Sequence, residues 1–157
     1  MINFSGAAAE LTQRDFQFDI DADGSADQIA FVGPGSGFLV LDKNEDGEIN
    51  DGSELFGALS GDGFQDLSTY DNDGNNWIDE NDAIYESLRI WTRDQDGASQ
   101  LIALGTADIG AIYLGHIETD FSIKNDQNEL LGQVRETGLA IKESGQLVSM
   151  QQLDLLA

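Results

Sequence analysis

The sequence has no cysteine, one histidine (His116) and one proline (Pro34) among its 157 residues. The absence of cysteine excludes disulfides, thiolate metal sites and cysteine nucleophiles. A single histidine leaves almost nothing for histidine-based zinc sites or Ser-His-Asp triads. We therefore expect His116 to be a surface or capping residue rather than a metal ligand.

Cations are also scarce, with 7 Lys and Arg against 30 Asp and Glu and a formal net charge of −23. So few scattered cations cannot form the basic patch that binds nucleic acid or an anionic membrane surface. No apolar run reaches the roughly 18 residues that span a bilayer. The first residues, Met1–Gly6, lack the cationic and apolar regions of a secretory signal. The composition predicts no nucleic-acid partner and no membrane insertion.

Carboxylates, which are abundant, recur in clusters that begin at Asp19, Asp42 and Asp71. A calcium ion takes roughly 6–8 oxygen ligands, which a short loop supplies from positions 1, 3, 5, 7, 9 and 12. Position 6 turns sharply and favours glycine. The clusters follow this spacing, so we expect two to three Ca²⁺ ions to be the cofactor.

The third cluster fits the calcium-loop spacing best. Asn76 replaces glycine at its position 6, which is tolerable because asparagine visits the left-handed region. Trp77 would supply a backbone carbonyl at position 7. The predicted ligands of this loop three are Asp71, Asp73, Asn75, Trp77, Asp79 and Asp82.

The other two clusters depart from the template at the closing position. In loop two Ser53 occupies position 12, and we expect Glu54 to close a loop one residue longer, with ligands Asp42, Asn44, Asp46, Glu48 and Glu54. Loop one has Ala30 at position 12 and suits a turn between two strands, with ligands Asp19, Asp21, Asp23, Ser25 and Asp27. A degenerate fourth loop keeps only Asp94, Asp96 and Gly97 and is expected to be empty.

The simpler interpretation is that Asp-Gly and Asn-Gly pairs are good turn formers. One such loop would leave both interpretations open. Three loops with the same alternation, in a chain of net charge −23, favour cation binding, because without an ion they would crowd like charges together.

The hydrophobic pattern predicts an α+β fold with paired EF-hand-like calcium loops, short helices and antiparallel hairpins. Alternation before and after loop one indicates a β-hairpin, Arg14–Phe18 with Gln28–Val32. A helix capped by Asp62 would bury Phe64, Leu67 and Tyr70, and a second helix, capped by Asp79, would bury Ile84, Tyr85 and Leu88. Ile49 and Ile78 would form a β-bridge that pairs loops two and three.

After Gly97 the alternating segments predict an antiparallel β-meander, with hairpin turns at 124–128 and 143–145. No long polar linker divides the chain. We expect a single domain over 1–157, with a calcium-loop half (1–97) and a β-meander half (98–157). The abrupt start suggests a fragment of a longer chain.

Several stretches resemble the EF-hand-like calcium-binding modules of bacterial secreted, surface and RTX-associated (hemolysin-type calcium-binding) proteins. They are Gly37–Gly57, Gly63–Asp71, Trp77–Asp82, Leu88–Trp91 and Gly110–Leu114. The resemblance implies calcium binding and an extracellular or cell-surface location, without an assigned activity; a protein or glycan partner stays open. Some related modules cleave themselves at an Asp-Pro bond when calcium binds, but the only proline here follows Gly33.

Two other functions are open to such an acidic chain. A glycosidase would need a pair of carboxylates, and the acids outside the loops form no recognisable pair: Asp15, Glu86, Asp108, Glu118, Asp120, Glu129 and Glu136. A calcium sensor with an adaptable apolar groove would be richer in methionine than Met1 and Met150. We therefore favour a non-enzymatic structural or interaction module over an enzyme or a sensor.

Overall fold

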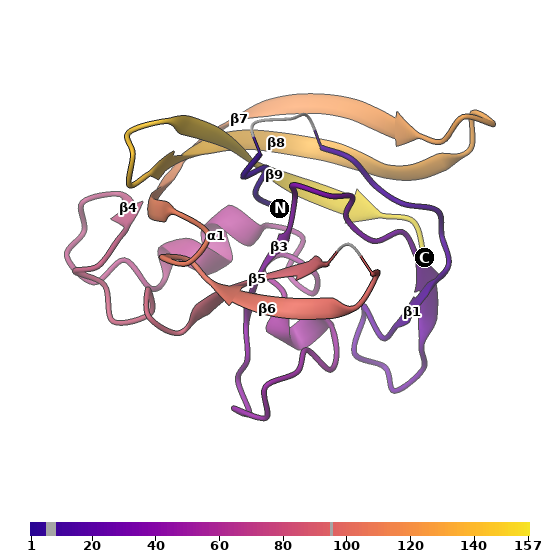
Figure 1. Ribbon diagram of the computed structural model, residues 1–157, viewed down its shortest axis with the longest axis horizontal. Coiled ribbons are helices and arrows are strands. Elements are labelled where there is room, and N and C mark those ends of the chain that lie inside the picture. Colours follow the sequence, from indigo (N-terminus) through magenta and orange to yellow (C-terminus); the bar gives the residue numbers. More distant parts are fainter. Residues whose placement is uncertain (6–8, 95) are drawn as a thin grey trace.

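The computed structural model describes residues 1–5, 9–94 and 96–157, and β-strands dominate it. Strands make up 44% of the chain and helices 6%. All strand pairs within the three sheets are antiparallel. Figure 1 shows the long strands β7, β8 and β9 as a twisted layer over the remaining elements.

The smallest sheet joins two short strands around loop one, β1 (Phe16–Phe18) and β2 (Asp27–Ile29). A second sheet has the order β3-β5-β6, with bounds Phe38–Leu41, Leu88–Arg93 and Ser99–Ala103. The largest has the order β4-β7-β8-β9, with bounds Trp77–Ile78, Ile109–Lys124, Leu130–Lys142 and Leu147–Leu155. The β1–β2 hairpin and the meander of β7, β8 and β9 follow the expected strand pattern, whereas β6, expected in the meander, pairs with β5 in the second sheet.

Two short helices follow β3. The 3₁₀ helix η1 (Gly52–Glu54) is capped by the Asp51 carboxylate, which accepts from the Ser53 N–H. The helix α1 (Gly63–Ser68) begins at the predicted cap, since the Asp62 carboxylate accepts from the Gln65 N–H at 2.9 Å.

Two clusters of buried side chains form the core. In the first, Phe64 and Leu67 of α1 pack with residues of the long sheet, such as Ile112. The second is aromatic and places Trp91, which is 5% exposed, against Phe31 with ring centroids 4.9 Å apart. Within the described residues, no helix is long and apolar enough to cross a membrane.

The expectation of an α+β fold is wrong. The helix expected to leave loop three does not form, and residues 80–87 make turns before β5 starts at Leu88. The turns have a local cause, because the buried Asp82 carboxylate accepts the N–H groups of Asn72 and Asp79 and folds the segment back. The β-branched and aromatic residues that follow then pair with β3.

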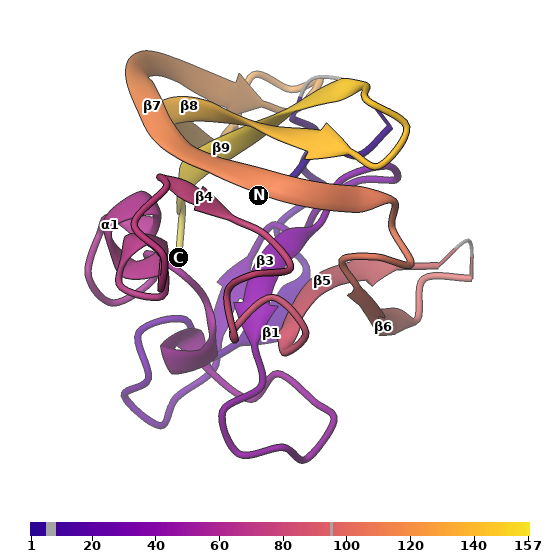
Figure 2. The same cartoon turned by 90° about the vertical axis from the view of Figure 1, so that its left-hand side faces the viewer.

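The expected pairing of loops two and three is also wrong. Ile78 lies in β4 opposite Ile112 of β7 instead of facing Ile49. Loop two contacts loop one, through a parallel bridge between Asp19 and Asp51. In Figure 2 the loop after β3 hangs from the end of the molecule opposite the long sheet, whereas β4 adjoins β7. The expected boundary between the two halves was residue 97. Strands from the two sides of this residue pair with each other, β4 with β7 and β5 with β6.

Candidate metal sites

The three predicted loops share one backbone conformation, although their sequences differ. Positions 4 and 6 are left-handed in each: Ala22 and Gly24, Glu45 and Gly47, and Gly74 and Asn76, with φ between 57° and 91°. Loop three thus moves its glycine to position 4 and places Asn76 at position 6, with φ of 67°. The prediction that asparagine would take the turning position is confirmed.

The first aspartate of each loop organises this turn. Its Oδ2 accepts the backbone N–H of position 6 at 2.9 Å in loop one, 2.7 Å in loop two and 2.9 Å in loop three. The position 5 side chain in turn accepts the N–H of position 7, at 2.8 to 2.9 Å. The side-chain oxygens at positions 1 and 5, from aspartate or asparagine, are thereby held in place in each loop.

The closing residues of loops two and three are buried carboxylates, with Glu54 5% and Asp82 1% exposed. Glu54 accepts the N–H groups of Lys43 and Asn50, at 3.0 and 2.8 Å. Asp82 accepts those of Asn72 and Asp79, at 2.7 and 3.1 Å. These donors occupy positions 2 and 9 of their loops, so the two acids have equivalent roles although one lies a residue later.

Carboxylate oxygens converge in two of the loops. Oxygens of Asp19, Asp21 and Asp23 lie within 4.8 Å of one another, as do those of Asp71, Asp73 and Asp82. Desolvation, followed by the charge of Asp23, raises the pKa of Asp21. Desolvation also raises the pKa of Asp73, with a contribution from Asp71. Anionic oxygens packed this closely suit a hard divalent cation such as Ca²⁺ or Mg²⁺.

The remaining predicted ligands lie at the rims of the loops. Asp27 begins β2 opposite Phe18, and its charge contributes to the raised pKa of Asp21. Asp79 accepts an amide hydrogen bond from Asn75 at 3.4 Å across loop three. Ser25, Glu48 and Trp77 occupy position 7, and each donates its N–H to the position 5 side chain; Asn44 accepts from the Asp46 N–H at 3.1 Å.

Two residues of loop two belong to this arrangement and were missed from the sequence. Asn50, at position 9, accepts from the Asn44 amide at 2.8 Å, so its side-chain oxygen faces the loop interior. The spacing alone contained that signal. Asp51 caps η1 and bridges to Asp19, and hydrogen bonds from Ser53 lower its pKa. Its partner in loop one is 32 positions away, which no local pattern indicates.

Outside the loops, the degenerate fourth segment forms a turn in which Asp94 accepts the N–H groups of Asp96 and Ala98, each at 2.9 Å.

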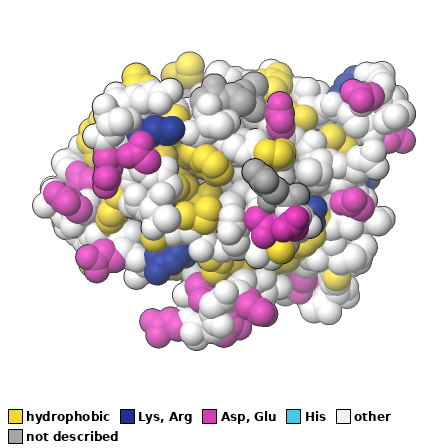
Figure 3. Space-filling model, in the orientation of Figure 1, with side chains coloured by type: hydrophobic (Ala, Val, Ile, Leu, Met, Phe, Trp, Pro, Cys, Tyr) yellow, Lys and Arg dark blue, Asp and Glu magenta, His cyan; other side chains and the backbone are white. Residues whose placement is uncertain are grey.

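On the long sheet, one hollow is lined by Arg135 together with three acids, Glu118, Asp120 and Glu136. The Arg135 guanidinium contacts Asp120 at 3.4 Å and Asp154 at 2.7 Å. His116 stacks on Phe64 with centroids 4.4 Å apart. Figure 3 shows acidic side chains spread over this face, with one group along its lower edge, and fewer lysine and arginine side chains.

Comparison with known proteins adds a family and a bacterial relative. Residues 2–155 match the SPM domain family. The iron-regulated protein FrpA of Neisseria meningitidis serogroup C is 32% identical over 152 residues, which cover 89% of this chain. The same match covers 13% of FrpA, so the chain spans a small part of its relative's length.

Proposed function

This chain belongs to the SPM domain family, and we propose that it is a calcium-binding structural or interaction module of a secreted or surface bacterial protein. In this role two to three Ca²⁺ ions stabilise the fold. Loops one, two and three would hold the ions, and the fourth segment would remain empty.

One observation carries the proposal: three loops of different sequence repeat the same left-handed positions and the same hydrogen bonds from position 6 to the first carboxylate. An isolated turn can form with a single hydrogen bond from a backbone N–H to an aspartate side chain. The repeated arrangement of positions 1, 3 and 5 instead supplies oxygen ligands from alternate residues, which is how calcium loops coordinate the ion. The buried closing acids Glu54 and Asp82 complete two of the loops.

An extracellular setting suits the energetics of such loops. Extracellular calcium modules bind at about 10⁻⁴–10⁻³ M, and binding only to the folded state at tenfold saturation stabilises it by roughly 1.4 kcal/mol per site. Three ions would change the formal charge from −23 to −17, which relieves part of the repulsion. The ions would replace the disulfides that a chain without cysteine cannot form.

We favour this role over a hydrolase because two of the acids outside the loops are held by a cation of the chain itself. Asp120 and Asp154 both pair with Arg135, whereas a glycosidase needs two carboxyl groups that flank the substrate bond. A sensor with a methionine-rich groove is also disfavoured, because Met150 is buried in the core at 5% exposure.

The decisive experiment is a calcium titration by calorimetry on chelator-treated protein, with thermal melts in calcium and in chelator. We expect two to three sites and a melting temperature that rises with calcium concentration. No binding heat together with no melting shift would overturn the proposal.

Variants assign the ions to the loops. Asp42→Ala and Asp71→Ala should each remove about one site from the stoichiometry. Asp126→Ala is a matched control, because it removes one negative charge from an exposed hairpin turn outside the loops. If all three variants bound the same number of ions, the ligand assignment would be wrong.

A further inference from the structure

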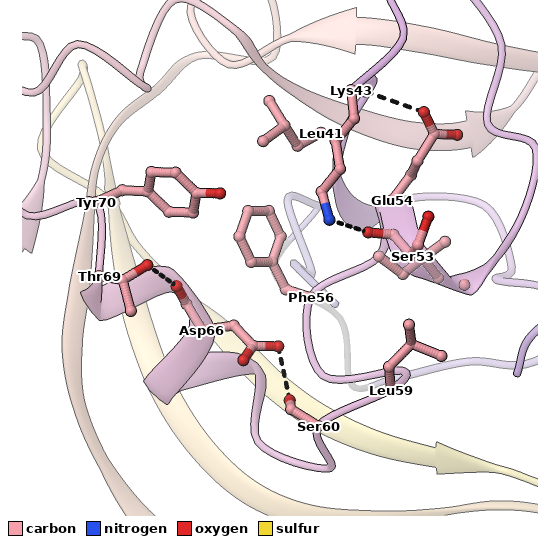
Figure 4. Close-up of a pocket in the computed structure, with 12 residues that line it drawn as sticks. Leu41, Lys43, Ser53, Glu54, Phe56, Leu59, Ser60, Asp66, Thr69 and Tyr70 are labelled. Carbon is pink, nitrogen blue, oxygen red and sulfur yellow. Dashed lines mark hydrogen bonds between the residues drawn. The ribbon is translucent and has the colours of Figure 1, made fainter. Parts of the chain in front are cut away.

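A cavity of about 270 Å³ lies between the ends of loop two and helix α1, which precedes loop three (Figure 4). One wall comes from Lys43, Ser53 and Glu54, which begin and close loop two. The opposite wall is the end of α1, where Thr69 and Tyr70 lead directly into Asp71. The cavity therefore adjoins both loops without using the oxygens that face their interiors.

Apolar side chains dominate the floor and the mouth of this cavity. Phe56 lies between the two walls and packs edge-on against Tyr70, with ring centroids 6.2 Å apart. Leu59 stands at the mouth and is 56% exposed, one of the few large apolar side chains this open to solvent. A cavity just below the roughly 300 Å³ of the smallest ligand pockets suits one side chain rather than a cofactor.

The polar groups of the cavity are mostly engaged with the protein. Asp66 accepts from the Gly57 N–H at 2.9 Å and the Ser60 hydroxyl at 2.7 Å. The Lys43 ammonium donates to the Ser53 carbonyl. The Tyr70 hydroxyl points toward the cavity in Figure 4.

The surroundings are strongly negative. Glu54 and Asp66 line the cavity, and the chain keeps a formal charge of −17 even with three calcium ions bound to its −23. Lys43 is the only cation among the lining residues. The anionic field favours a cationic occupant, and the net charge of −23 disfavours a second copy of this chain.

We propose that this cavity binds an apolar or aromatic side chain of an extended partner peptide whose neighbouring residues are lysine or arginine. The side chain inserts between Phe56 and Leu59, and the flanking cations face the acids around the mouth. The Tyr70 hydroxyl is then available for a backbone group of the peptide.

Calcium strengthens this binding, and this calcium dependence rests on the proposed function. Glu54 fixes the Lys43 backbone at 3.0 Å, so the closing of loop two also positions one wall of the cavity. Loading loop three fixes Asp71, the residue after Tyr70. A peptide that prefers the ordered cavity must, by linkage, raise the affinity for calcium equally.

The test uses the capped peptide Gly-Lys-Phe-Lys-Gly, with Gly-Lys-Ala-Lys-Gly and Gly-Glu-Phe-Glu-Gly as controls. Amide chemical shifts of the full chain are followed by NMR in calcium and in chelator. We expect shifts at Phe56, Leu59 and Tyr70 with the first peptide, and at least about tenfold weaker binding of each control peptide. Leu59→Ser should weaken binding about fivefold.

The matched control variant is Leu147→Ser, because Leu147 is 58% exposed and belongs to β9 outside the cavity. Equal peptide binding by the two serine variants, or equal binding of the three peptides, would overturn the assignment of the site. Equal peptide affinity in calcium and in chelator would overturn the calcium dependence of peptide binding. Calorimetry on the same samples separates these failures from a failure of calcium binding itself.

Discussion

The closing acids show how one side chain compensates for loop length. Glu54 lies one residue later than Asp82 relative to the start of its loop. Both nevertheless accept the N–H groups of positions 2 and 9. The additional methylene of glutamate allows the longer loop two to close with the same pair of hydrogen bonds that Asp82 makes within loop three.

Glu54→Asp should therefore destabilise the protein. The shorter side chain cannot reach both the Lys43 and Asn50 N–H groups, and losing a hydrogen bond to a charged group costs about 1.5–3 kcal/mol. We expect a melting temperature several degrees lower and weaker calcium binding at loop two. The control is Glu48→Asp, because Glu48 is exposed and takes part through its backbone. Identical melting of the two variants would contradict the assignment.

The pKa shifts predict that acid has opposite effects with and without calcium. Desolvation, with the charge of neighbouring carboxylates, raises the pKa of Asp21 and Asp73 in the folded ion-free chain. The folded state then binds protons more tightly than the unfolded state, so lowering the pH from 7 toward the ordinary pKa of aspartate should stabilise it. In saturating calcium the same protons compete with the ion, and acid should destabilise.

Melting in chelator and in calcium, at several pH values from 7 down to about 4, the ordinary range of aspartate, measures this reversal. Asp51 does not interfere, because its pKa is lowered and its protonation falls below this range. The double variant Asp21→Asn, Asp73→Asn should show a weaker pH response in chelator. A response of the same sign in both solutions would refute the explanation.

At the scale of elements, the sequence predicted those features that depend on neighbouring residues. The β1–β2 hairpin, the cap of α1 at Asp62 and the left-handed Asn76 all follow from local alternation or side-chain chemistry. The helix after loop three was wrong because Ile84, Tyr85 and Leu88 have helical spacing but serve turns and a strand. The hydrogen bonds of Asp82 within loop three and the pairing of Leu88 with β3 override that spacing.

The pairing of the loops depends on residues that are distant in sequence. Gly52 donates its N–H to the Asp19 carbonyl at 2.8 Å, and a Cβ at Gly52 would lie 1.8 Å from the Ile20 carbonyl oxygen. Such a close approach of two backbones requires glycine. The sequence around Gly52 contains no signal that this glycine contacts loop one, so the contact could not be predicted.

Gly52→Ala should accordingly separate loops one and two. The steric conflict involves backbone atoms, so we expect a loss of about 1–3 kcal/mol, several degrees in melting temperature and weaker calcium binding at both loops. Gly105→Ala is the matched control, because a Cβ there has no neighbour within 4 Å. Normal binding at loop one in the Gly52 variant would show that the contact does not link the sites.

At the scale of the whole molecule, charge and topology act against each other. The β4–β7 and β5–β6 pairs tie the loop-bearing part to the β-meander. The net charge of −23 opposes this compact arrangement, with a high density of acids in the loops. The fold must therefore gain stability from anything that screens or binds to these carboxylates.

Salt and calcium should accordingly have separable effects on stability. Raising NaCl from 0.01 to 0.15 M shortens the Debye length from about 30 to 8 Å, so the chelated protein should melt at a higher temperature in the higher salt. With calcium bound, the residual repulsion is smaller and the gain from salt should shrink. Because screening also weakens the attraction for the cation, apparent calcium affinity should fall as salt rises. Melting in a salt series with chelator, calcium or magnesium measures all three effects. A salt response unchanged by calcium would mean that the ions do not neutralise the charges that limit stability.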